Sequence, residues 1–197
     1  MPPKSRERNR GPAAAPGNRQ ALLAAARKLF AERGYHVPLN AIAKAAGVGQ
    51  GVLYRNFPRR LDLAFAVFEE NFTELEAIAA DTDVRTFFRL WSRLLDYTIQ
   101  DTAFLEMSVD ARRTTTDYRG AERMQALIEP ALARARDAGL VDPELTAQDV
   151  MTAQRMAYGL VVTSDDPGGV RWTIDHALTV LGRRWPAATV PVDATDP

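Results

Sequence analysis

The 197-residue sequence contains no cysteine, only two histidines and no long uncharged apolar run. Without cysteine the chain has no disulfide bond, no thiolate metal ligand and no cysteine nucleophile, which suits a reducing compartment. His36 and His176 are far apart, and neither is followed by a metal-ligating residue three or four positions later, so we expect no metal site. No run approaches the roughly 18 apolar residues that a membrane span needs, and residues 1–17 lack the apolar core of a signal peptide. These absences predict a cytoplasmic protein with no membrane partner.

Catalytic patterns are missing as well. The segment Gly47-Val-Gly-Gln-Gly51 has the glycines of a phosphate-binding loop, but such a loop follows a strand, whereas residues 39–46 have a helical pattern. The sequence holds neither a G-K-[ST] loop nor a serine in a G-x-S-x-G motif. Its adjacent acidic pairs diverge if they lie on a helix and are solvated if they lie in a loop. We therefore expect no enzymatic activity and no cofactor.

The formal net charge of the chain is zero, but the charges are unevenly distributed. Residues 1–60 contain 12 of the 25 Lys and Arg but only two acidic residues, whereas residues 61–197 contain the other 23 acidic residues. A basic N-terminal part on an acidic body is typical of a nucleic-acid-binding head joined to a module with another task. A basic patch of this kind also fits a solvated face or an anionic lipid surface, and charge alone does not choose between them.

Apolar residues recur at intervals of three and four along most of the chain, and no segment shows the alternation of a strand. The sequence therefore predicts an all-α protein with about nine helices. Locally, we expect Asp83 to cap the fifth helix and residues 112–117 to form a polar loop. Thr146 and Asp149 have the spacing of a capping box at the start of the eighth helix.

Residues 18–60 combine one longer helix with two short ones. Gly34 ends the first predicted helix, Pro38 lies in the first turn of the second, and Gly47 forms the tight turn before the third. The small side chain of Ala43 allows the two short helices to approach closely. This arrangement is a helix-turn-helix, in which the second short helix enters the major groove of DNA.

Within this region and just after it, three segments carry a specific set of residues: Ala25-Ala26-Arg27-Lys28-Leu29-Phe30 with Gly34-Tyr35, then Ile42-Ala43-Lys44-Ala45-Ala46-Gly47-Val48, then Leu53-Tyr54-Arg55-Asn56-Phe57 followed by Arg60 and Leu63. As a set they resemble the head of a TetR-type (tetracycline repressor-like) regulator. The resemblance implies that the DNA-facing side of the recognition helix carries Gln50, Gly51, Val52 and Tyr54. It also implies phosphate contacts by Lys44, Tyr54, Arg55 and Arg60. The sequence departs from the family pattern at four positions, where it has Pro38, Gly49, Val52 and Asn56.

Beyond Arg60 the resemblance is one of architecture, and it implies about five further helices that form a ligand pocket and a dimer interface. For an effector pocket, the candidates on those helices are apolar, aromatic and Met side chains: Phe68, Phe72, Trp91, Leu95, Met107, Met124 and Leu127. Glu106 and Arg123 are charged candidates close to this set. For a homodimer interface, the candidates come from the last two long helices: Met151, Met156, Gly159, Leu160, Trp172, Leu178 and Leu181. Each of these apolar residues also fits an ordinary monomer core.

The resemblance and the charge distribution together predict a DNA-binding transcriptional regulator. We expect a repressor that a small-molecule effector releases from a near-palindromic operator in double-stranded DNA. The alternative is an all-α small-molecule-binding or enzymatic module without DNA binding, and a peripheral membrane protein is a weaker third class. The predicted organisation is a disordered basic arm (1–17), a helix-turn-helix DNA-binding domain (18–60), an effector-binding and dimerisation domain (61–186) and a flexible tail (187–197). Lys4, Arg6, Arg8 and Arg10 of the arm are candidates for contacts in the minor groove.

Overall fold

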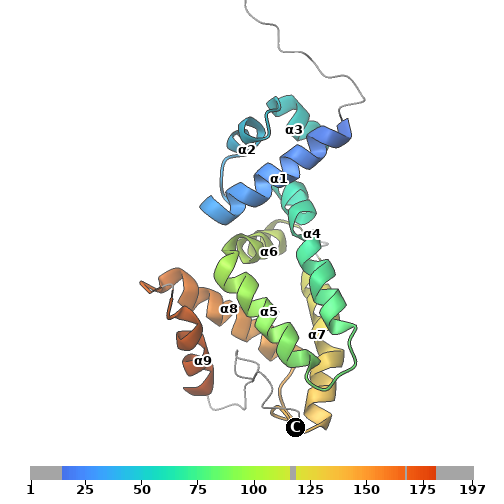
Figure 1. Ribbon diagram of the computed structural model, residues 1–197, viewed down its shortest axis with the longest axis vertical. Helices are drawn as coiled ribbons and strands as arrows, with labels where there is room; N and C mark the ends of the chain where they lie inside the picture. Colours follow the sequence, from blue (N-terminus) through green and yellow to red (C-terminus); the bar gives the residue numbers. More distant parts are fainter. Residues whose placement is uncertain (1–14, 116–118, 167, 181–197) are drawn as a thin grey trace, which may run out of the picture. The chain divides into compact units, whose positions relative to one another are not determined.

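A computed structural model describes residues 15–115, 119–166 and 168–180 (Figure 1). These residues form nine helices and no strand, as the sequence predicts for an all-α protein. The helices are α1 (Ala15–Arg33), α2 (Leu39–Ala45), α3 (Gln50–Asn56), α4 (Arg60–Ala79), α5 (Thr86–Gln100), α6 (Thr102–Thr114), α7 (Gly120–Asp137), α8 (Ala147–Thr163) and α9 (Val170–Val180). Residues 1–14 of the predicted arm, the predicted tail (187–197) and Leu181 lie outside the described residues. The predicted end of the arm at Gly17 is wrong, because α1 already begins at Ala15.

The chain divides into two compact units, Met1–Val67 and Phe68–Pro197. The boundary lies inside α4, seven residues later than the division after Arg60 that the sequence suggests. The reason is that the first two turns of α4 belong to the N-terminal unit, where Leu63, Ala64 and Val67 are buried. The main-chain oxygen of Val67 also accepts a hydrogen bond of 2.7 Å from the Arg27 guanidinium of α1.

In the N-terminal unit, α1 packs against both short helices, α2 and α3. Large side chains from all the helices of this unit are almost fully buried there: Leu22, Phe30, Tyr35, Ile42, Leu53, Phe57 and Leu63. Gly34 and Gly47 follow the ends of α1 and α2 with φ angles of 76° and 66°. This left-handed conformation is strained for other residues, so glycine at these two positions lets the chain reverse direction.

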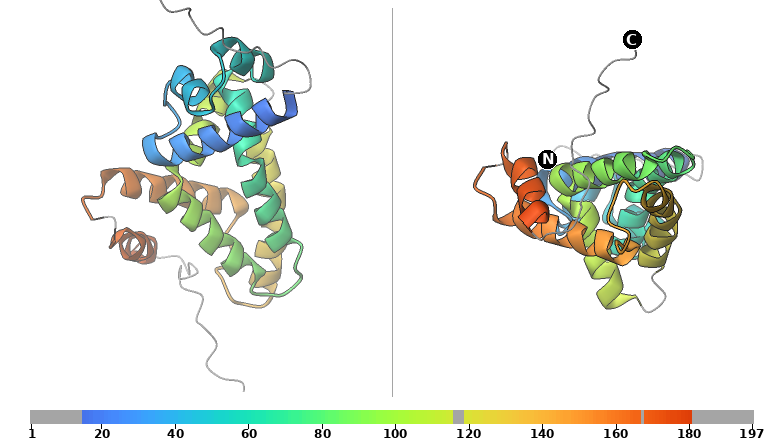
Figure 2. Two further views of the ribbon diagram at one scale, coloured as in Figure 1. Left: turned by 45° about the horizontal axis from the view of Figure 1, so that its top comes forward. Right: turned by 90° about the horizontal axis from the view of Figure 1, so that it is seen from below.

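The C-terminal unit is built around α5, which packs against α6, α7 and α8, while α9 packs against α8. Figure 2 shows α8 and α9 lying side by side. Helix α5 is amphipathic, and its apolar side faces the core with Phe87, Leu90, Trp91, Leu94 and Leu95, each at most 1 % exposed. The sequence pattern of this helix therefore accounts for its central position.

Of three local features that the sequence predicts, the structure confirms one and differs from the other two. Thr146 and Asp149 form the predicted capping box: the Thr146 hydroxyl accepts from the Asp149 main-chain nitrogen, and the Asp149 carboxylate accepts from that of Thr146. The prediction that Asp83 caps α5 is wrong, because α5 begins at Thr86 and the Asp83 carboxylate instead accepts a 2.6 Å hydrogen bond from Arg85 N in the preceding turn. The predicted loop at 112–117 is also wrong in its first part, since α6 continues to Thr114 with its apolar residues buried.

Candidate nucleic-acid interface

Helices α2 and α3 form the helix-turn-helix that the sequence predicts. Ile42 and Ala43 of α2 and Leu53 of α3 are at most 1 % exposed, so the two helices share one buried side. After the turn at Gly47, the main-chain nitrogen of Val48 donates a 3.0 Å hydrogen bond to the Ala43 oxygen. These contacts fix the direction in which α3 leaves the turn.

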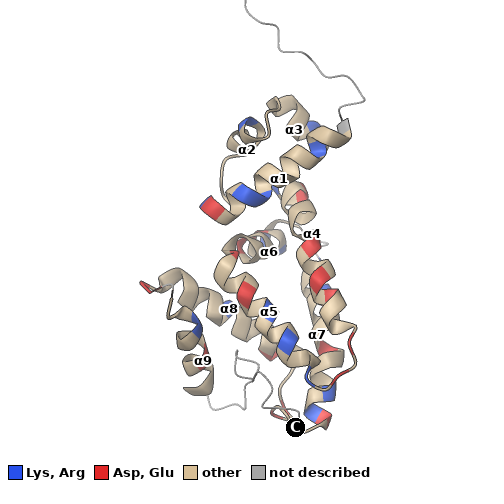
Figure 3. Cartoon of the chain, viewed as in Figure 1, with Lys and Arg blue, Asp and Glu red and all other residues tan. Residues whose placement is uncertain are grey.

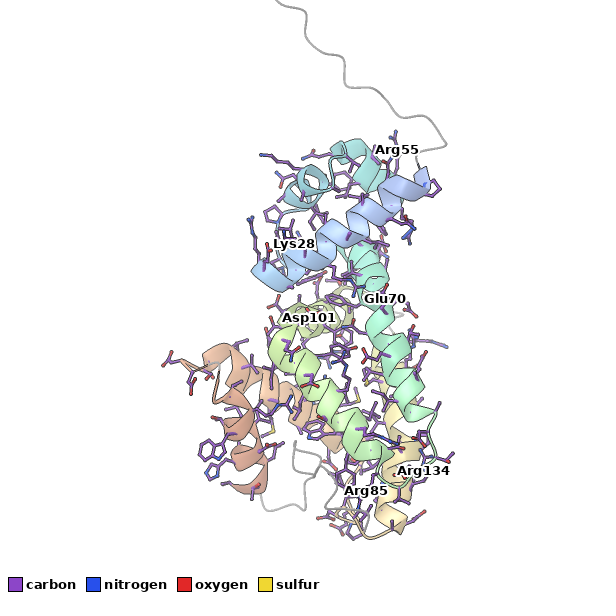
Figure 4. The ribbon with its side chains drawn as sticks, in the orientation of Figure 1. Lys28, Arg55, Glu70, Arg85, Asp101 and Arg134 are labelled. Atoms are coloured by element: carbon purple, nitrogen blue, oxygen red, sulfur yellow. The ribbon has the colours of Figure 1, made fainter. Side chains whose placement is uncertain are left out.

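The other side of α3 is exposed. Gln50, Gly51, Tyr54 and Arg55 are exposed, and half of the Tyr54 surface is accessible. Arg55 extends outward from α3 (Figure 4). No atom lies within 4 Å of the position that a Cβ would take at Gly51, so the space beside this turn of α3 is open. Together these residues form a short, accessible surface that we call the α3 face.

Two further residues of α3 have mixed surroundings. Val52 is half-buried, so part of its side chain remains accessible beside Gly51. The Asn56 amide donates a 2.8 Å hydrogen bond to the Val52 main-chain oxygen and so closes the last turn of α3. Asn56 therefore has a structural role in this helix.

The predicted phosphate-contacting residues are placed differently from one another. Lys44 is exposed at the end of α2, and Tyr54 and Arg55 are exposed on α3. Arg60 is half-buried, and its Nη1 donates to the main-chain oxygens of Tyr35 and Val37 at 2.6 Å each. Arg60 therefore joins the start of α4 to the loop after α1, a role for which the sequence gives no local signal because it depends on a contact 25 residues away.

The described part of the N-terminal unit is strongly basic. Between residues 15 and 60 the chain has eight Lys and Arg side chains, and its one acidic residue is Glu32. Figure 3 shows Lys and Arg on α1, α2 and α3, whereas Asp and Glu are frequent along α4 and in the C-terminal unit. The α3 face thus lies in a positive environment, which favours a polyanionic partner.

A small cavity of about 50 Å³ lies in the C-terminal unit. It is lined by residues of four helices: Phe72, Phe104, Ser108, Arg112, Gly120, Ala121, Met124, Met151 and Arg155. Of the seven pocket candidates from the sequence, Phe72 and Met124 line this cavity. The other five are buried in the core of the unit: Phe68, Trp91, Leu95, Met107 and Leu127. Phe104 is not among the candidates from the sequence, although its ring lies 5.5 Å from that of Phe72 in an edge-to-face arrangement.

The two charged pocket candidates do not line the cavity. Arg123 forms ion pairs with Glu69 at 3.0 Å and Glu76 at 2.8 Å, and its guanidinium lies 4.5 Å from the centre of the Phe72 ring. Glu106 lies near Tyr158, where burial is the main cause of a raised Tyr158 pKa, followed by the charge of Glu106.

The dimer candidates lie on α8 and α9, apart from Leu181. Met156 and Trp172 are 42 % and 69 % exposed, Gly159 and Leu160 are half-buried, and Leu178 is buried. Met151 lines the cavity described above. Two exposed apolar residues of these helices were missed by the sequence analysis, Val162 and Val180, although they share the helical spacing of the candidates. The Trp172 ring stacks on His176 with 5.1 Å between ring centres.

Three side chains connect α4 and α5 within the C-terminal unit. The Glu74 carboxylate accepts hydrogen bonds from Arg93 at 2.8 Å and from the Tyr97 hydroxyl at 2.6 Å. The hydrogen bond from Arg93, followed by that from Tyr97, lowers the pKa of Glu74. Burial, followed by the bond to Glu74, raises the pKa of Tyr97 to about 12. This cluster is structural, because it lies outside the cavity.

Two kinds of feature are absent from the described residues. No helix among them is long and apolar enough to cross a membrane. Those residues also contain no group of three or more His, Cys, Asp or Glu side chains that could hold a metal ion.

The comparisons with known proteins agree with this geometry. Residues 22–67 match the family model described as bacterial regulatory proteins, tetR family. A Staphylococcus aureus protein, the HTH-type transcriptional regulator SAB2452 of strain bovine RF122 / ET3-1, is 33 % identical over 94 residues, which are 47 % of this chain and 44 % of that protein. The chain thus matches less than half the length of this relative.

Two solved structures show the same fold over most of the chain. One, titled for the control of antibiotic production by bacterial hormones, has a TM-score of 0.59 with 23 % identity and covers 86 % of this chain and 98 % of its own. The other is SmeT, the repressor of the Stenotrophomonas maltophilia multidrug efflux pump SmeDEF, with a TM-score of 0.55, 20 % identity and coverage of 91 % and 96 %. These two structures show the fold, whereas the family match is confined to residues 22–67. Residues 22–67 of this chain are therefore similar to the DNA-binding head of the bacterial regulatory proteins of the tetR family, and most of the chain shares the fold of these two solved structures.

Proposed function

We propose that this chain is a homodimeric transcriptional repressor that binds a near-palindromic operator and leaves it when a small-molecule effector binds the C-terminal unit. The observation that carries the proposal is the α3 face, an accessible surface on a rigidly packed short helix in a basic unit. Such a helix fits the major groove, where side chains reach the edges of the bases.

Individual side chains of the α3 face suit different parts of DNA. Gln50 is exposed at the first position of α3, and its amide can both donate to and accept from an adenine edge. Gly51 allows close approach because it has no side chain, and the methyl groups of Val52 suit the thymine methyl. Lys44, Tyr54 and Arg55 carry donors suited to phosphate, and such contacts position a protein on the duplex without reading its sequence. Arg60 keeps its other N–H groups for a phosphate contact.

A dimer accounts for the exposed apolar side chains of α8 and α9. Met156, Val162 and Trp172 project from these helices although most apolar side chains of the C-terminal unit are buried. Open space beside Gly159 leaves room for a neighbouring helix. Two copies that pair through α8 and α9 would bury these residues in a four-helix interface. A two-fold dimer places two α3 faces on one DNA, which requires two related half-sites.

The release step requires that ligand binding and DNA binding oppose each other. Helix α4 is continuous from Arg60 in the N-terminal unit to Ala79 in the C-terminal unit, and its Phe72 lines the cavity. A ligand that displaces Phe72 therefore acts on the helix that begins in the DNA-binding unit. A coupling free energy of about 1 to 3 kcal/mol would weaken operator binding roughly 5- to 150-fold.

A gel-shift titration with DNA from upstream of the gene tests this function. We expect a complex that survives an excess of non-specific DNA and weakens as the salt concentration rises. The alternative, a ligand-binding or enzymatic module without DNA binding, predicts no complex. Equal competition by specific and non-specific DNA would mean that the α3 face does not read a sequence.

A further inference from the structure

Two positively charged side chains line the cavity of the C-terminal unit. Arg112 of α6 and Arg155 of α8 both line it, and none of the described residues that line it is Asp or Glu. Both arginines are exposed to solvent as well as lining the cavity. Arg155 donates one hydrogen bond of 3.0 Å to the Thr152 hydroxyl, which leaves its other N–H groups available.

These two arginines differ from most others of the unit. Arg89, Arg93, Arg123, Arg136 and Arg171 each form an ion pair with an Asp or Glu. Within the described residues, neither Arg112 nor Arg155 has a carboxylate partner, although residues 61–197 contain 23 acidic side chains. A guanidinium fork matches a carboxylate well, so two arginines on one cavity suit an anionic ligand.

The start of α7 adds to the positive potential at the same place. Gly120 and Ala121, the first residues of this 18-residue helix, line the cavity, and the side chain of the N-cap residue Arg119 makes no capping hydrogen bond. The first N–H groups of a helix lack partners within it and carry the positive end of its dipole. They therefore lie on the same cavity as Arg112 and Arg155.

The inner wall is apolar and adaptable. Phe72 and Phe104 form its aromatic part, and Met124 and Met151 complete it with unbranched side chains that change rotamer easily. The present space of about 50 Å³ is smaller than a benzene ring requires, since a cavity of about 150 Å³ holds benzene. A ligand whose ring enters the cavity completely would therefore move these side chains, which gives it a way to change the packing of α4.

We propose that this cavity binds a small carboxylic acid with a planar apolar body, whose carboxylate lies between Arg112 and Arg155 and whose body enters between Phe72 and Met124. The inference rests on the proposed function in that the acid would be the effector. The inference goes beyond that function because it names the chemical class of the ligand and the two arginines that select the charge of the ligand.

Calorimetry on the full chain tests the selection of charge. Benzoate and cinnamate are titrated beside their uncharged counterparts, benzyl alcohol and cinnamyl alcohol. We expect each acid to bind at least about tenfold more tightly than its alcohol, because charge-assisted hydrogen bonds are stronger than neutral ones. Equal binding of acid and alcohol, or no binding of either acid at millimolar concentration, would overturn the proposal.

Substitutions of the two arginines test where the carboxylate of the ligand binds. Arg112→Gln and Arg155→Gln should each weaken acid binding about tenfold and leave alcohol binding unchanged. Arg113→Gln is the matched control, because Arg113 is an exposed neighbour that does not line the cavity. An equal loss in this control would show that the acids bind to general positive charge, against the proposal. Ala121→Leu, which fills the cavity, should weaken acids and alcohols alike, and unchanged binding in this folded variant would place the site elsewhere.

The experiments distinguish a failure of the repressor function from a failure of the carboxylate site. Calorimetry needs no DNA, so acid binding that depends on both arginines supports the site even if the gel shift shows no complex. If instead DNA binds and an uncharged compound releases it while neither acid binds, the repressor function stands and the carboxylate site is wrong.

Discussion

The Arg60 guanidinium holds the main chain at Tyr35. Its Nη1 donates a 2.6 Å hydrogen bond to the Tyr35 main-chain oxygen and a second one to that of Val37, and its central carbon lies 5.4 Å from the centre of the Tyr35 ring. Tyr35 itself is fully buried. The start of α4 is thereby joined to the loop that leads into the helix-turn-helix.

Replacing Arg60 should destabilise the N-terminal unit. Arg60→Leu leaves two main-chain oxygens without their charged donor, so we expect the free energy of unfolding to fall by about 1 to 3 kcal/mol. Urea denaturation followed by circular dichroism measures this. Arg59→Leu is the control, because Arg59 is exposed and pairs with Asp62 at the surface, and it should have little effect. Equal stability of the two variants would show that the Arg60 hydrogen bonds contribute nothing.

The residues of the α3 face and its surroundings should separate into two classes in DNA-binding assays. Gln50→Ala should change the preference at one or two base pairs by about 1 to 3 kcal/mol. Lys44→Ala and Tyr54→Ala should weaken binding to most sequences, and loss of the Lys44 charge should reduce the slope of log K against log salt by about 0.9. Gln20→Ala, at an exposed position of α1, is a control of the same residue type as Gln50. If Gln50→Ala weakens matched and mismatched operators equally, Gln50 does not read a base.

Introducing a negative charge on α9 should weaken the proposed dimer. Trp172→Glu places a carboxylate at a side chain that is 69 % exposed here and would be buried between two copies. We expect the dimer dissociation constant to rise at least about tenfold, measured by sedimentation velocity over a range of concentrations. Gln148→Glu makes a similar charge change at an exposed position near the start of α8 and should leave the dimer intact. A dimer that tolerates both Trp172→Glu and Gly159→Leu would not use this surface.

Glu74 should contribute to acid sensitivity. Because its hydrogen bond from Arg93 lowers its pKa in the folded chain, its contribution to stability is present above its unfolded pKa and is lost as the pH falls through the folded pKa. Glu74→Gln should therefore make the free energy of unfolding less dependent on pH below about 4.5. The effect should be small because this carboxylate is largely solvated. Glu122→Gln, at an exposed residue of α7, is the control, and an identical pH profile for both variants would contradict the prediction.

Local sequence patterns were enough to predict the helices and the helix-turn-helix. Local spacing was enough to place the helix-turn-helix, because the buried positions Ile42, Ala43 and Leu53 and the turn at Gly47 all lie within 12 residues. The capping box at Thr146 was likewise predictable, since both partners belong to one turn. Asp83 shows where prediction from local sequence fails, because an Asp that could cap a helix can equally accept a hydrogen bond within a turn.

The tertiary structure decided what depends on distant segments. The cavity brings together Phe72, Met124 and Arg155 from three different helices, and helical spacing alone gives an apolar residue the same pattern in a core as in a cavity wall. Trp91 and Leu95 fit the pocket pattern yet fill the centre of the unit. The sequence implies a phosphate contact for Arg60, and only the folded chain shows that its guanidinium also bonds to the main chain of Tyr35. A side chain's neighbours along the helix follow from its position, whereas its partners across the fold depend on how the helices pack.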